Sequence, residues 1–208
     1  AKSYIFIQSY IFRQDELGRQ FMEALCQKAR EGLEVRLLVD GMGSMLVPRR
    51  FFRQLERAGG KVETFFPPFV PYLHFQINYR NHRKLLIVDG VVGYIGGFNV
   101  GDEYVGKGPL GYWRDTHLRF QGSAVGGMEL RFVQDWNYGA EDPIQDHPIS
   151  LLREYREEEL RPCITGAKAI RHVPVQMVSG GPDAKWPTIR NGFLRLISSA
   201  RRKLYIQT

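Results

Sequence analysis

The chain has 208 residues, of which 43% are hydrophobic, and its 29 basic residues outnumber its 22 acidic residues to give a formal net charge of +7. This composition supports a buried core, and no apolar run reaches the roughly 18 residues of a membrane span or resembles a signal peptide. The charge favours an anionic partner, either nucleic acid or an acidic lipid surface, and the spacing of Cys26 and Cys163 indicates neither a zinc site nor a disulfide framework.

The first 66 residues alternate between strand and helix patterns. Apolar runs predict strands at 4–8, 35–39 and 61–66, and apolar residues at helical spacing predict helices at 15–30 and 48–57. Gly32 is expected to end the first helix, and Gly59 with Gly60 the second. Strands and helices in this order imply a parallel core, with ligands at the carboxyl ends of the strands.

Residues 65–75 read F-F-P-P-F-V-P-Y-L-H-F. The segment is too rich in proline for a helix or central strand, and it is too apolar for an ordinary solvated loop. It therefore needs a cover. Either it folds back onto the domain's own core, or its aromatic residues line a path for acyl chains or touch a bilayer. The aromatic residues in question are Phe65, Phe66, Phe69, Tyr72 and Phe75.

Residues 81–99 contain the pattern of a β-hairpin. Two apolar runs, 85–88 and 91–95, flank Asp89 and Gly90, which is the strongest short signal for such a turn. If these two residues form the turn, Val88 faces Val91, Lys84 faces Ile95 and His82 faces Gly97. Because side chains alternate along a strand, His82 and Lys84 then share one face, opposite a residue with no side chain. This arrangement leaves room for a ligand.

The residues after the hairpin suggest a site for an anion. Asn99 is predicted to cap a helix that begins at about Val100, with Asp102 completing the cap, and a helix N-terminus binds anions. An imidazole, an ammonium, a carboxamide and backbone N–H groups together suit a tetrahedral phosphate. Taken singly, His82 reads as a structural strand residue, Asp89 as a turn residue and Asn99 as a helix cap.

The pattern H-x-K-x4-D-x6-G-G-x-N is filled at every position from His82 to Asn99. With it the chain resembles the phospholipase D superfamily, whose HKD motif this is. The segments N-H-R-K-L-L-I-V-D-G, G-G-F-N-V-G-D-E-Y and Y-W-R-D-T-H-L-R look like bacterial cardiolipin synthases, and the resemblance covers essentially the whole chain. It implies an α/β fold, a phospholipase D-like α-β-α sandwich with a mixed, mostly parallel central sheet, in which the first half is complete and the second half is truncated.

The resemblance also implies the chemistry. The protein would form cardiolipin and glycerol from two phosphatidylglycerol molecules through a phosphohistidine on His82, with no metal ion or other cofactor. Lys84 and Asn99 would hold the non-bridging oxygens, and Asp115 would orient His82. The implied catalytic residues are His82, Lys84 and Asp89, and the implied substrate-binding residues are Gly96, Gly97, Asn99 and Asp115. Asp89 belongs to the motif, yet its place at the hairpin tip suggests a structural role.

The remaining chain predicts a second, incomplete half. A strand at 116–120 and an amphipathic helix at 123–138 close the first domain, 1–139, and a polar linker follows at 140–170. Residues 171–208 then predict strands at 173–178 and 204–207 around a helix at 186–200. The last nine residues align without gaps on the first nine, with Ala, Ile and Gln identical, so a second phospholipase D-like domain is expected to begin at residue 171.

These expectations also indicate the binding partners and the alternative functions. The partners would be anionic phospholipid, above all phosphatidylglycerol, a membrane surface, and a second HKD half from the same chain or a second copy, whose His protonates the leaving alkoxide. The aromatic stretch favours lipid over nucleic acid. The location would be the bacterial cytoplasmic membrane, through a segment outside these residues. The alternatives are a phospholipase D-type hydrolase, a nuclease of the same superfamily, and a fragment that binds anionic lipid without catalysis.

Overall fold

The structure is a computed structural model that describes residues 1–66, 80–109, 111–112, 114–147, 154–155, 158, 170–181 and 184–206. Contacts divide the chain into two compact units, 1–173 and 174–208, which are described separately. The expected start of the second domain at residue 171 lies close to this division. The assignment of residues 171–208 to a second phospholipase D-like domain stays a prediction.

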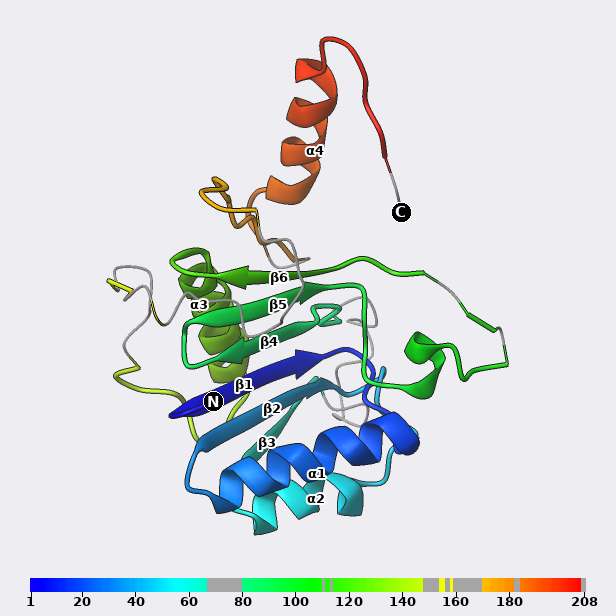
Figure 1. The fold of residues 1–208 in the computed structure, drawn as a ribbon, viewed down its shortest axis with the longest axis vertical. Coiled ribbons are helices and arrows are strands. Elements are labelled where there is room, and N and C mark those ends of the chain that lie inside the picture. The colour runs from blue at the N-terminus through cyan, green and yellow to red at the C-terminus, as the bar shows by residue number, and fades with distance from the viewer. Residues whose placement is uncertain are drawn as a thin grey trace. The chain divides into compact units, whose positions relative to one another are not determined.

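The first unit is a six-stranded sheet covered by helices on both faces (Figure 1). Its elements in chain order are β1 Tyr4–Ser9, α1 Glu16–Arg30, β2 Glu34–Asp40, α2 Arg49–Arg57, β3 Lys61–Phe65, β4 Leu85–Val88, β5 Val92–Gly96, η1 Asp102–Val105, β6 His117–Gln121 and α3 Ala124–Asn137. The strand order across the sheet is β3-β2-β1-β4-β5-β6. Apart from the helix expected from about Val100, these elements confirm the strands and helices expected before residue 140, with ends displaced by one or two residues.

The sheet is mixed, as expected, but it is not mostly parallel. Strands β1, β2 and β3 are parallel to one another, whereas the pairs β1–β4, β4–β5 and β5–β6 are antiparallel. Parallel neighbours need a crossover such as α1 or α2, whereas a two-residue turn can join only antiparallel strands. The parallel part therefore ends where the helical crossovers end.

Two apolar clusters hold the helices to the sheet. On one face, α1 and α2 pack against β1 and β2 around the buried Phe12, Leu37 and Leu55. On the other face, α3 places Phe132 and Trp136 on Phe6 and Leu38. Gly93 of β5 lets α3 approach closely, because a Cβ added there would lie 2.6 Å from the sulfur of Met128. The result is the predicted α-β-α sandwich.

The hairpin differs from its predicted register by one residue. Asp89 and Gly90 both have positive φ angles, 54° and 64°, and the N–H of Val91 donates to the carbonyl of Val88 at 3.0 Å. Val91 thereby closes the turn, and Val88 pairs with Val92 instead. Leu85 pairs with Ile95 at the other end, where β4 begins. The predicted opposition of Val88 to Val91, of Lys84 to Ile95 and of His82 to Gly97 is therefore wrong.

The helix expected from about Val100 is also wrong. Val100 forms a β-bridge with Phe12, and only a short 3-10 helix, η1, follows with Gly101 at its N-cap. The carboxylate of Asp102 accepts the N–H of Leu17 at 2.8 Å, while Asp15 accepts the N–H of Asp102 at 2.7 Å. Asp102 thus caps α1 rather than its own turn, and no α-helix begins after Asn99 to supply the N-terminus from which an anion site was expected.

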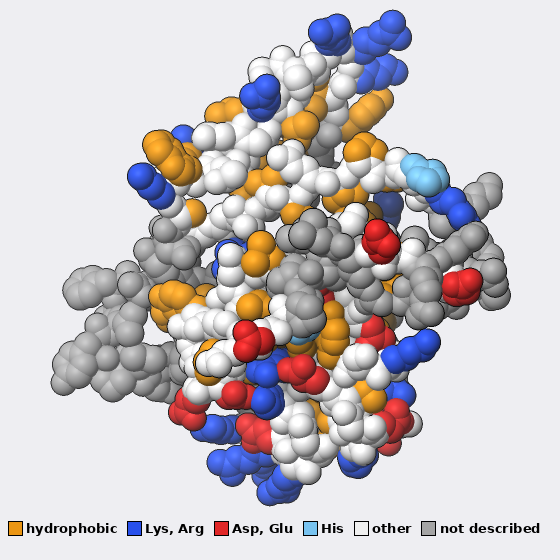
Figure 2. Space-filling model, turned by 90° about the vertical axis from the view of Figure 1, so that its left-hand side faces the viewer, with side chains coloured by type: hydrophobic (Ala, Val, Ile, Leu, Met, Phe, Trp, Pro, Cys, Tyr) orange, Lys and Arg blue, Asp and Glu red, His pale blue; other side chains and the backbone are white. Residues whose placement is uncertain are grey.

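The second unit contains α4, Thr188–Ser199, which confirms the helix expected at 186–200. Neither of the strands predicted at 173–178 and 204–207 forms among the residues that the structure describes there. A strand requires a paired neighbour, and no described residue of α4 is buried. Several large apolar side chains of this unit are exposed, among them Trp186, Phe193, Leu194 and Tyr205, and orange side chains are visible over it in Figure 2.

Candidate active site

Residue Asn81, immediately before the expected nucleophile, is fixed from two sides. Its N–H donates to the carboxylate of Asp40 at the end of β2, at 2.9 Å, and its side-chain amide donates to Asp135 of α3, at 3.0 Å. Asn81 and both carboxylates are at least 98% buried. The end of β2 and helix α3 therefore fix the start of the HKD segment, residues 82–89.

Asp135 also holds the neighbouring polar groups in place. It accepts hydrogen bonds from Gln8 at 2.7 Å and from Arg83 at 2.9 Å, and it pairs with Arg131 one helical turn earlier. A buried carboxylate is costly unless cations and hydrogen bonds compensate it, and both are present here. Asp135 of α3 is thus hydrogen-bonded both to β1 and to the HKD segment.

The side chains of His82 and Lys84 converge on one aromatic ring. The imidazole lies 4.6 Å from the centroid of Tyr10 in an edge-on arrangement, and the ammonium of Lys84 lies 5.4 Å from the same centroid. Lys84 is 95% buried, and its ammonium donates to the carbonyl of His82 at 2.8 Å. His82 is exposed. A reachable imidazole therefore stands beside a sequestered cation.

The surroundings set the protonation of both groups. Partial burial, and then the charge of Lys84, lower the pKa of His82 below its usual 6.5. Burial lowers the pKa of Lys84 to about 8, although Asp115 and Asp40 oppose this shift. At neutral pH the imidazole is therefore unprotonated and nucleophilic, while most of the Lys84 population carries its positive charge.

Gly96 and Gly97 leave room for the head of β6, and their contact with substrate stays a prediction. A Cβ on Gly97 would overlap the carboxylate of Asp115, and one on Gly96 would overlap the carbonyl of Thr116. Asp115 therefore lies against Gly97. Its negative charge offsets part of the lowering that burial causes in the pKa of Lys84. The space expected opposite a glycine is occupied by a carboxylate of the chain itself. The orientation of His82 by Asp115 stays a prediction.

Asn99 is buried and anchors the loop that follows β5. Its side-chain carbonyl accepts the N–H of Ile11 at 2.9 Å, and its amide nitrogen donates to the hydroxyl of Tyr104. Val100 continues the attachment, because its N–H donates to the carbonyl of Ile11 at 3.1 Å. The carboxamide thus fixes the segment after β1, and its contact with phosphate stays a prediction.

His117, which the sequence reasoning did not single out, supports the Gly96–Asn99 loop. Its Nδ1 accepts the N–H of Phe98 at 3.3 Å, and the two rings are stacked with centroids 5.2 Å apart. Burial lowers the pKa of His117, so Nδ1 keeps the lone pair that this bond needs. The available signal was the position of His117 two residues after Asp115, at the start of a strand.

Asp89 lies at the end of β4 away from Lys84. Its carboxylate accepts the N–H groups of Lys2 and Ser3, both at 2.7 Å, and that of Tyr4 at 3.0 Å. These bonds fix the start of β1 against the hairpin turn. They match the structural role suggested by its place at the hairpin tip, and a direct catalytic role for Asp89 stays a prediction.

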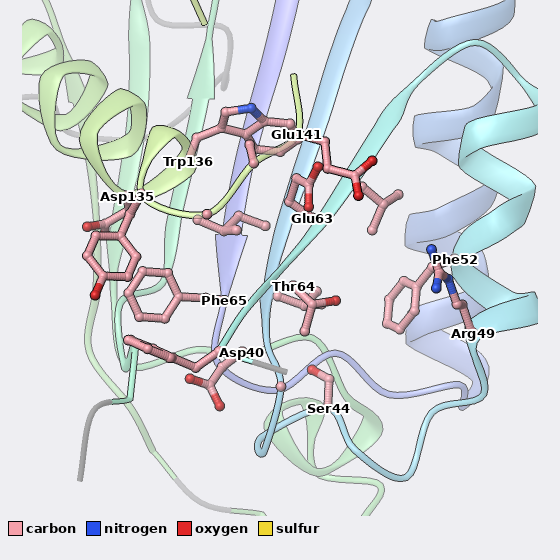
Figure 3. A pocket seen from close by; sticks show the side chains of 18 of the residues that line it. Asp40, Ser44, Arg49, Phe52, Glu63, Thr64, Phe65, Asp135, Trp136 and Glu141 are labelled. Atoms are coloured by element: carbon pink, nitrogen blue, oxygen red, sulfur yellow. The ribbon is translucent and has the colours of Figure 1, made fainter. Parts of the chain in front are cut away.

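A cavity of about 670 Å³ adjoins the base of the HKD segment (Figure 3). Asp40 and Asp135 contribute to its wall, together with Phe65, Phe66 and Trp136. The rings of Phe65 and Phe66 pack on Tyr138, at 5.6 and 5.4 Å. The start of the aromatic stretch is therefore folded onto the domain, whereas Phe69, Tyr72 and Phe75 lie outside the described residues.

Two further findings concern the parts of the chain that the structure describes. None of the helices there has the length and apolar character needed to cross a bilayer. No three His, Cys, Asp or Glu side chains gather there in an arrangement that would hold a metal ion.

Comparison with known proteins identifies relatives for this arrangement. The family model described as cardiolipin synthase, PLD-like domain, matches residues 1–107. The chain is 46% identical over 209 residues to the major cardiolipin synthase ClsA of Bacillus subtilis and to a cardiolipin synthase of Listeria innocua. Both matches cover 100% of this chain and 41% of the relative, so the chain spans about two fifths of the length of these proteins.

The fold is similar to that of a solved structure. The crystal structure of phosphatidylserine synthase from Haemophilus influenzae matches with a TM-score of 0.50 at 16% identity, over 77% of this chain and 36% of the other. At this identity the match concerns the fold alone.

Proposed function

The chain belongs to the family of cardiolipin synthase phospholipase D-like domains, and on this premise we propose that it carries the nucleophile of a phosphatidyltransferase. The observation that supports this proposal is the convergence of the unprotonated, exposed His82 and the buried ammonium of Lys84 on the ring of Tyr10. A nucleophile that attacks phosphorus needs a free lone pair. The negative charge that gathers on the phosphate oxygens during the attack needs a cation nearby.

In the first step, a nitrogen of His82 attacks the phosphorus of one phosphatidylglycerol. The N–P bond forms, the P–O bond to glycerol breaks, and the glycerol oxygen takes a proton from a general acid. Lys84, and a side-chain N–H of Asn99, stabilise the two non-bridging oxygens as negative charge gathers on them. The product of this step is a phosphatidyl group on His82.

In the second step, the hydroxyl of another phosphatidylglycerol attacks the same phosphorus. The new O–P bond forms, the N–P bond breaks, and the hydroxyl proton returns to the group that acted as the acid. The sum of the two steps is cardiolipin and glycerol. In this proposal Asp115 holds His82 in the reactive orientation and stabilises its cationic form.

The general acid is proposed to be a second histidine. These 208 residues contain a single H-x-K-x4-D pattern, from His82 to Asp89, and no other His here is followed by Lys two positions later. A second copy of the motif, supplied by the same protein or by another subunit, would provide the acid. Without it the rate should fall by roughly 10²–10⁴-fold.

The substrate is proposed to be a membrane lipid rather than a nucleic acid. The names of relatives that match the whole chain at 46% identity support cardiolipin formation, and the net charge of +7 suits an anionic lipid surface. Lys and Arg side chains lie on the α1 and α2 side of the molecule, the lower part of Figure 2, where they are interspersed with Asp and Glu side chains. We place the enzyme at the bacterial cytoplasmic membrane, through a segment outside these residues.

The test uses the full-length protein with phosphatidylglycerol in mixed micelles, with and without EDTA. Cardiolipin and glycerol should appear in equal amounts, and EDTA should leave the rate unchanged. Phosphatidic acid as the main product would indicate the hydrolase instead. Faster cleavage of single-stranded DNA, falling steeply with salt, would indicate the nuclease. Binding of anionic vesicles without turnover of any phosphodiester would leave only the non-catalytic alternative.

A further inference from the structure

We propose that Tyr10 is a positioning residue for the HKD motif, whose ring holds His82 and Lys84 in reactive geometry; this inference rests on the proposed role of His82 as nucleophile. Tyr10 follows β1 directly and belongs to no motif that the sequence reasoning singled out. It is the residue on which the two motif side chains meet.

The two contacts use different parts of the ring's charge distribution. The planes of Tyr10 and His82 are inclined by 61° with centroids 4.6 Å apart, which is a favourable aromatic geometry. The ammonium of Lys84 lies 5.4 Å from the ring centroid, within the range of a cation–π attraction. One ring therefore restricts the rotation of the imidazole and gives the buried cation an electron-rich neighbour.

The backbone of Tyr10 is itself held by the loop after β2. The hydroxyl of the buried Ser44 donates to the carbonyl of Tyr10 at 3.3 Å, and a Cβ on Gly43 would overlap that same carbonyl. Asp40 fixes this loop by accepting the N–H groups of Met42 and Gly43, at 2.9 and 3.0 Å. The D-G-M-G-S sequence at 40–44 thus forms a loop that holds the backbone of Tyr10 in place.

The carboxylate of Asp40 positions both partners in the contact between Tyr10 and His82. Asp40 accepts the N–H of Asn81, and through Asn81 it places His82; through Gly43 and Ser44 it places Tyr10. The ring and the motif are consequently positioned from one point at the end of β2. A geometry fixed in this way is the kind that supports a near-attack arrangement of nucleophile and cation.

The charged form of Lys84 is stabilised by nearby carboxylates as well as by the ring of Tyr10. Asp115 at the head of β6 and Asp40 at the end of β2 favour the ammonium, whereas burial opposes it and leaves the pKa of Lys84 at about 8. His82, the other titratable neighbour, is lowered in pKa by the same cation. Removing the ring should take away one favourable contact of the charged form, so the pKa of Lys84 should fall further.

The experiment compares Tyr10→Phe with Tyr10→Leu in the full-length protein. Tyr10→Phe keeps the ring, whereas Tyr10→Leu removes it. The matched control is Tyr94→Leu, because Tyr94 of β5 is also a half-buried tyrosine with a cation, Arg119, 5.9 Å from its ring centroid. Two readouts are taken: the pKa of Lys84, by an NMR pH titration of ¹³C-labelled lysine, and kcat and KM on phosphatidylglycerol and on bis(p-nitrophenyl) phosphate.

We expect Tyr10→Phe and Tyr94→Leu to retain kcat within about twofold, since each keeps the ring at position 10. Tyr10→Leu should lower kcat by roughly 10- to 100-fold with little change in KM, because misplaced reacting groups slow the chemical step. It should also lower the pKa of Lys84. An unchanged kcat and pKa in Tyr10→Leu, or an equal loss in Tyr94→Leu, would overturn the proposal.

Two additions keep the result decisive. If Tyr10→Leu fails to fold, fluorinated phenylalanines at position 10 weaken the electron-rich face without changing its shape, and kcat should then fall as fluorine is added; a constant kcat would count against Tyr10. If the wild type cleaves bis(p-nitrophenyl) phosphate but not phosphatidylglycerol, the proposed substrate is wrong while Tyr10 is still tested. If it cleaves neither, the pKa of Lys84 decides whether the ring contact acts.

Discussion

Lys84 donates a hydrogen bond from its ammonium to the backbone carbonyl of His82, at 2.8 Å. The cation is thus attached to the residue whose reaction it is proposed to assist, and the attachment lies within a segment of three residues. It requires no particular pairing between the two strands of the hairpin. This explains why the two groups converge although the predicted opposition of Lys84 to Ile95 is wrong.

The first prediction concerns the nucleophile. In the full-length enzyme, His82→Ala should lower turnover by on the order of 10³-fold or more, since alanine offers no nitrogen to attack the phosphorus. Rapid acid quenching of the wild type with phosphatidylglycerol should leave an acid-labile phosphatidyl group that peptide mapping assigns to His82. The matched control is His172→Asn, because His172 is exposed with φ 57° and Asn tolerates that backbone. A phosphatidyl group on another residue would contradict the assignment.

The second prediction concerns pH. Because the pKa of His82 is lowered below 6.5, kcat/KM should fall only when the pH drops below about 6.5, as the imidazole becomes protonated. Because the pKa of Lys84 is about 8, kcat/KM should fall again above about pH 8, as the ammonium loses its proton. A rate profile of the free enzyme measures both limits.

Lys84→Arg tests which group produces the upper limit. Arginine stays charged throughout this range, so the variant should lose the decline above pH 8 even if its rate at neutral pH is lower. Persistence of that decline would mean that another group produces it. The lowered pKa of His82 also implies that the unfolded chain binds more protons below about pH 6.5, so folding stability should decrease as the pH falls through that range.

The third prediction separates stability from chemistry at Asp89. Asp89→Asn should reduce the free energy of unfolding by about 1–2 kcal/mol, because three backbone N–H groups lose a charged acceptor. Asn also suits the φ of 54° at this turn position. Urea denaturation measures the loss. Asp146→Asn is the matched control, since Asp146 is exposed and has φ 53°.

The outcome that contradicts this assignment is a selective loss of rate. If Asp89→Asn unfolds at the same urea concentration as the wild type but turns over phosphatidylglycerol far more slowly, Asp89 acts in the reaction itself. A lower unfolding midpoint with an unchanged rate per folded molecule is the expected result.

The fourth prediction concerns Asp135. Asp135→Asn should lower stability by about 2–3 kcal/mol, because Arg83 and Arg131 then lose their buried anion, although both side chains remain partly accessible to water. The rate should fall as well, since Asn81 loses one of its two attachments next to His82. Asp142→Asn is the control, an exposed carboxylate paired with Lys61, and it should leave the midpoint and the rate unchanged. Equal effects of the two substitutions would contradict the prediction that Asp135 stabilises the fold and the HKD segment more than an exposed carboxylate does.

The local patterns of the chain predicted its elements well. Periodicity located α1, α2 and α3, and Asp89 with Gly90 marked the hairpin turn. These features depend on residues close together in the sequence, such as apolar spacing or a turn that needs positive φ. The HKD pattern likewise names His82 and Lys84 directly, because both lie in one short segment.

The sequence alone did not determine which distant groups meet. Asp102 looked like a cap for its own helix, yet it caps α1, since α1 begins beside it in space and leaves its first N–H groups unpaired. Asp135 falls at a buried position of α3 between Phe132 and Trp136, a signal that went unused. The register was missed for a different, local reason, because the hydrogen bond from Val91 to Val88 closes the turn and removes one residue from the ladder.

The sequence by itself determined the alternation of elements and the identity of the reactive pair. Only the tertiary structure decided how that pair is placed: Tyr10, Asn81 and the carboxylate of Asp40 come from three separate segments. Their proximity follows from the parallel pairing of β1 with β2, which brings both carboxyl ends to one edge, and from the antiparallel return of β4 beside β1. Contacts of this kind depend on how the whole sheet packs, and no local propensity encodes them.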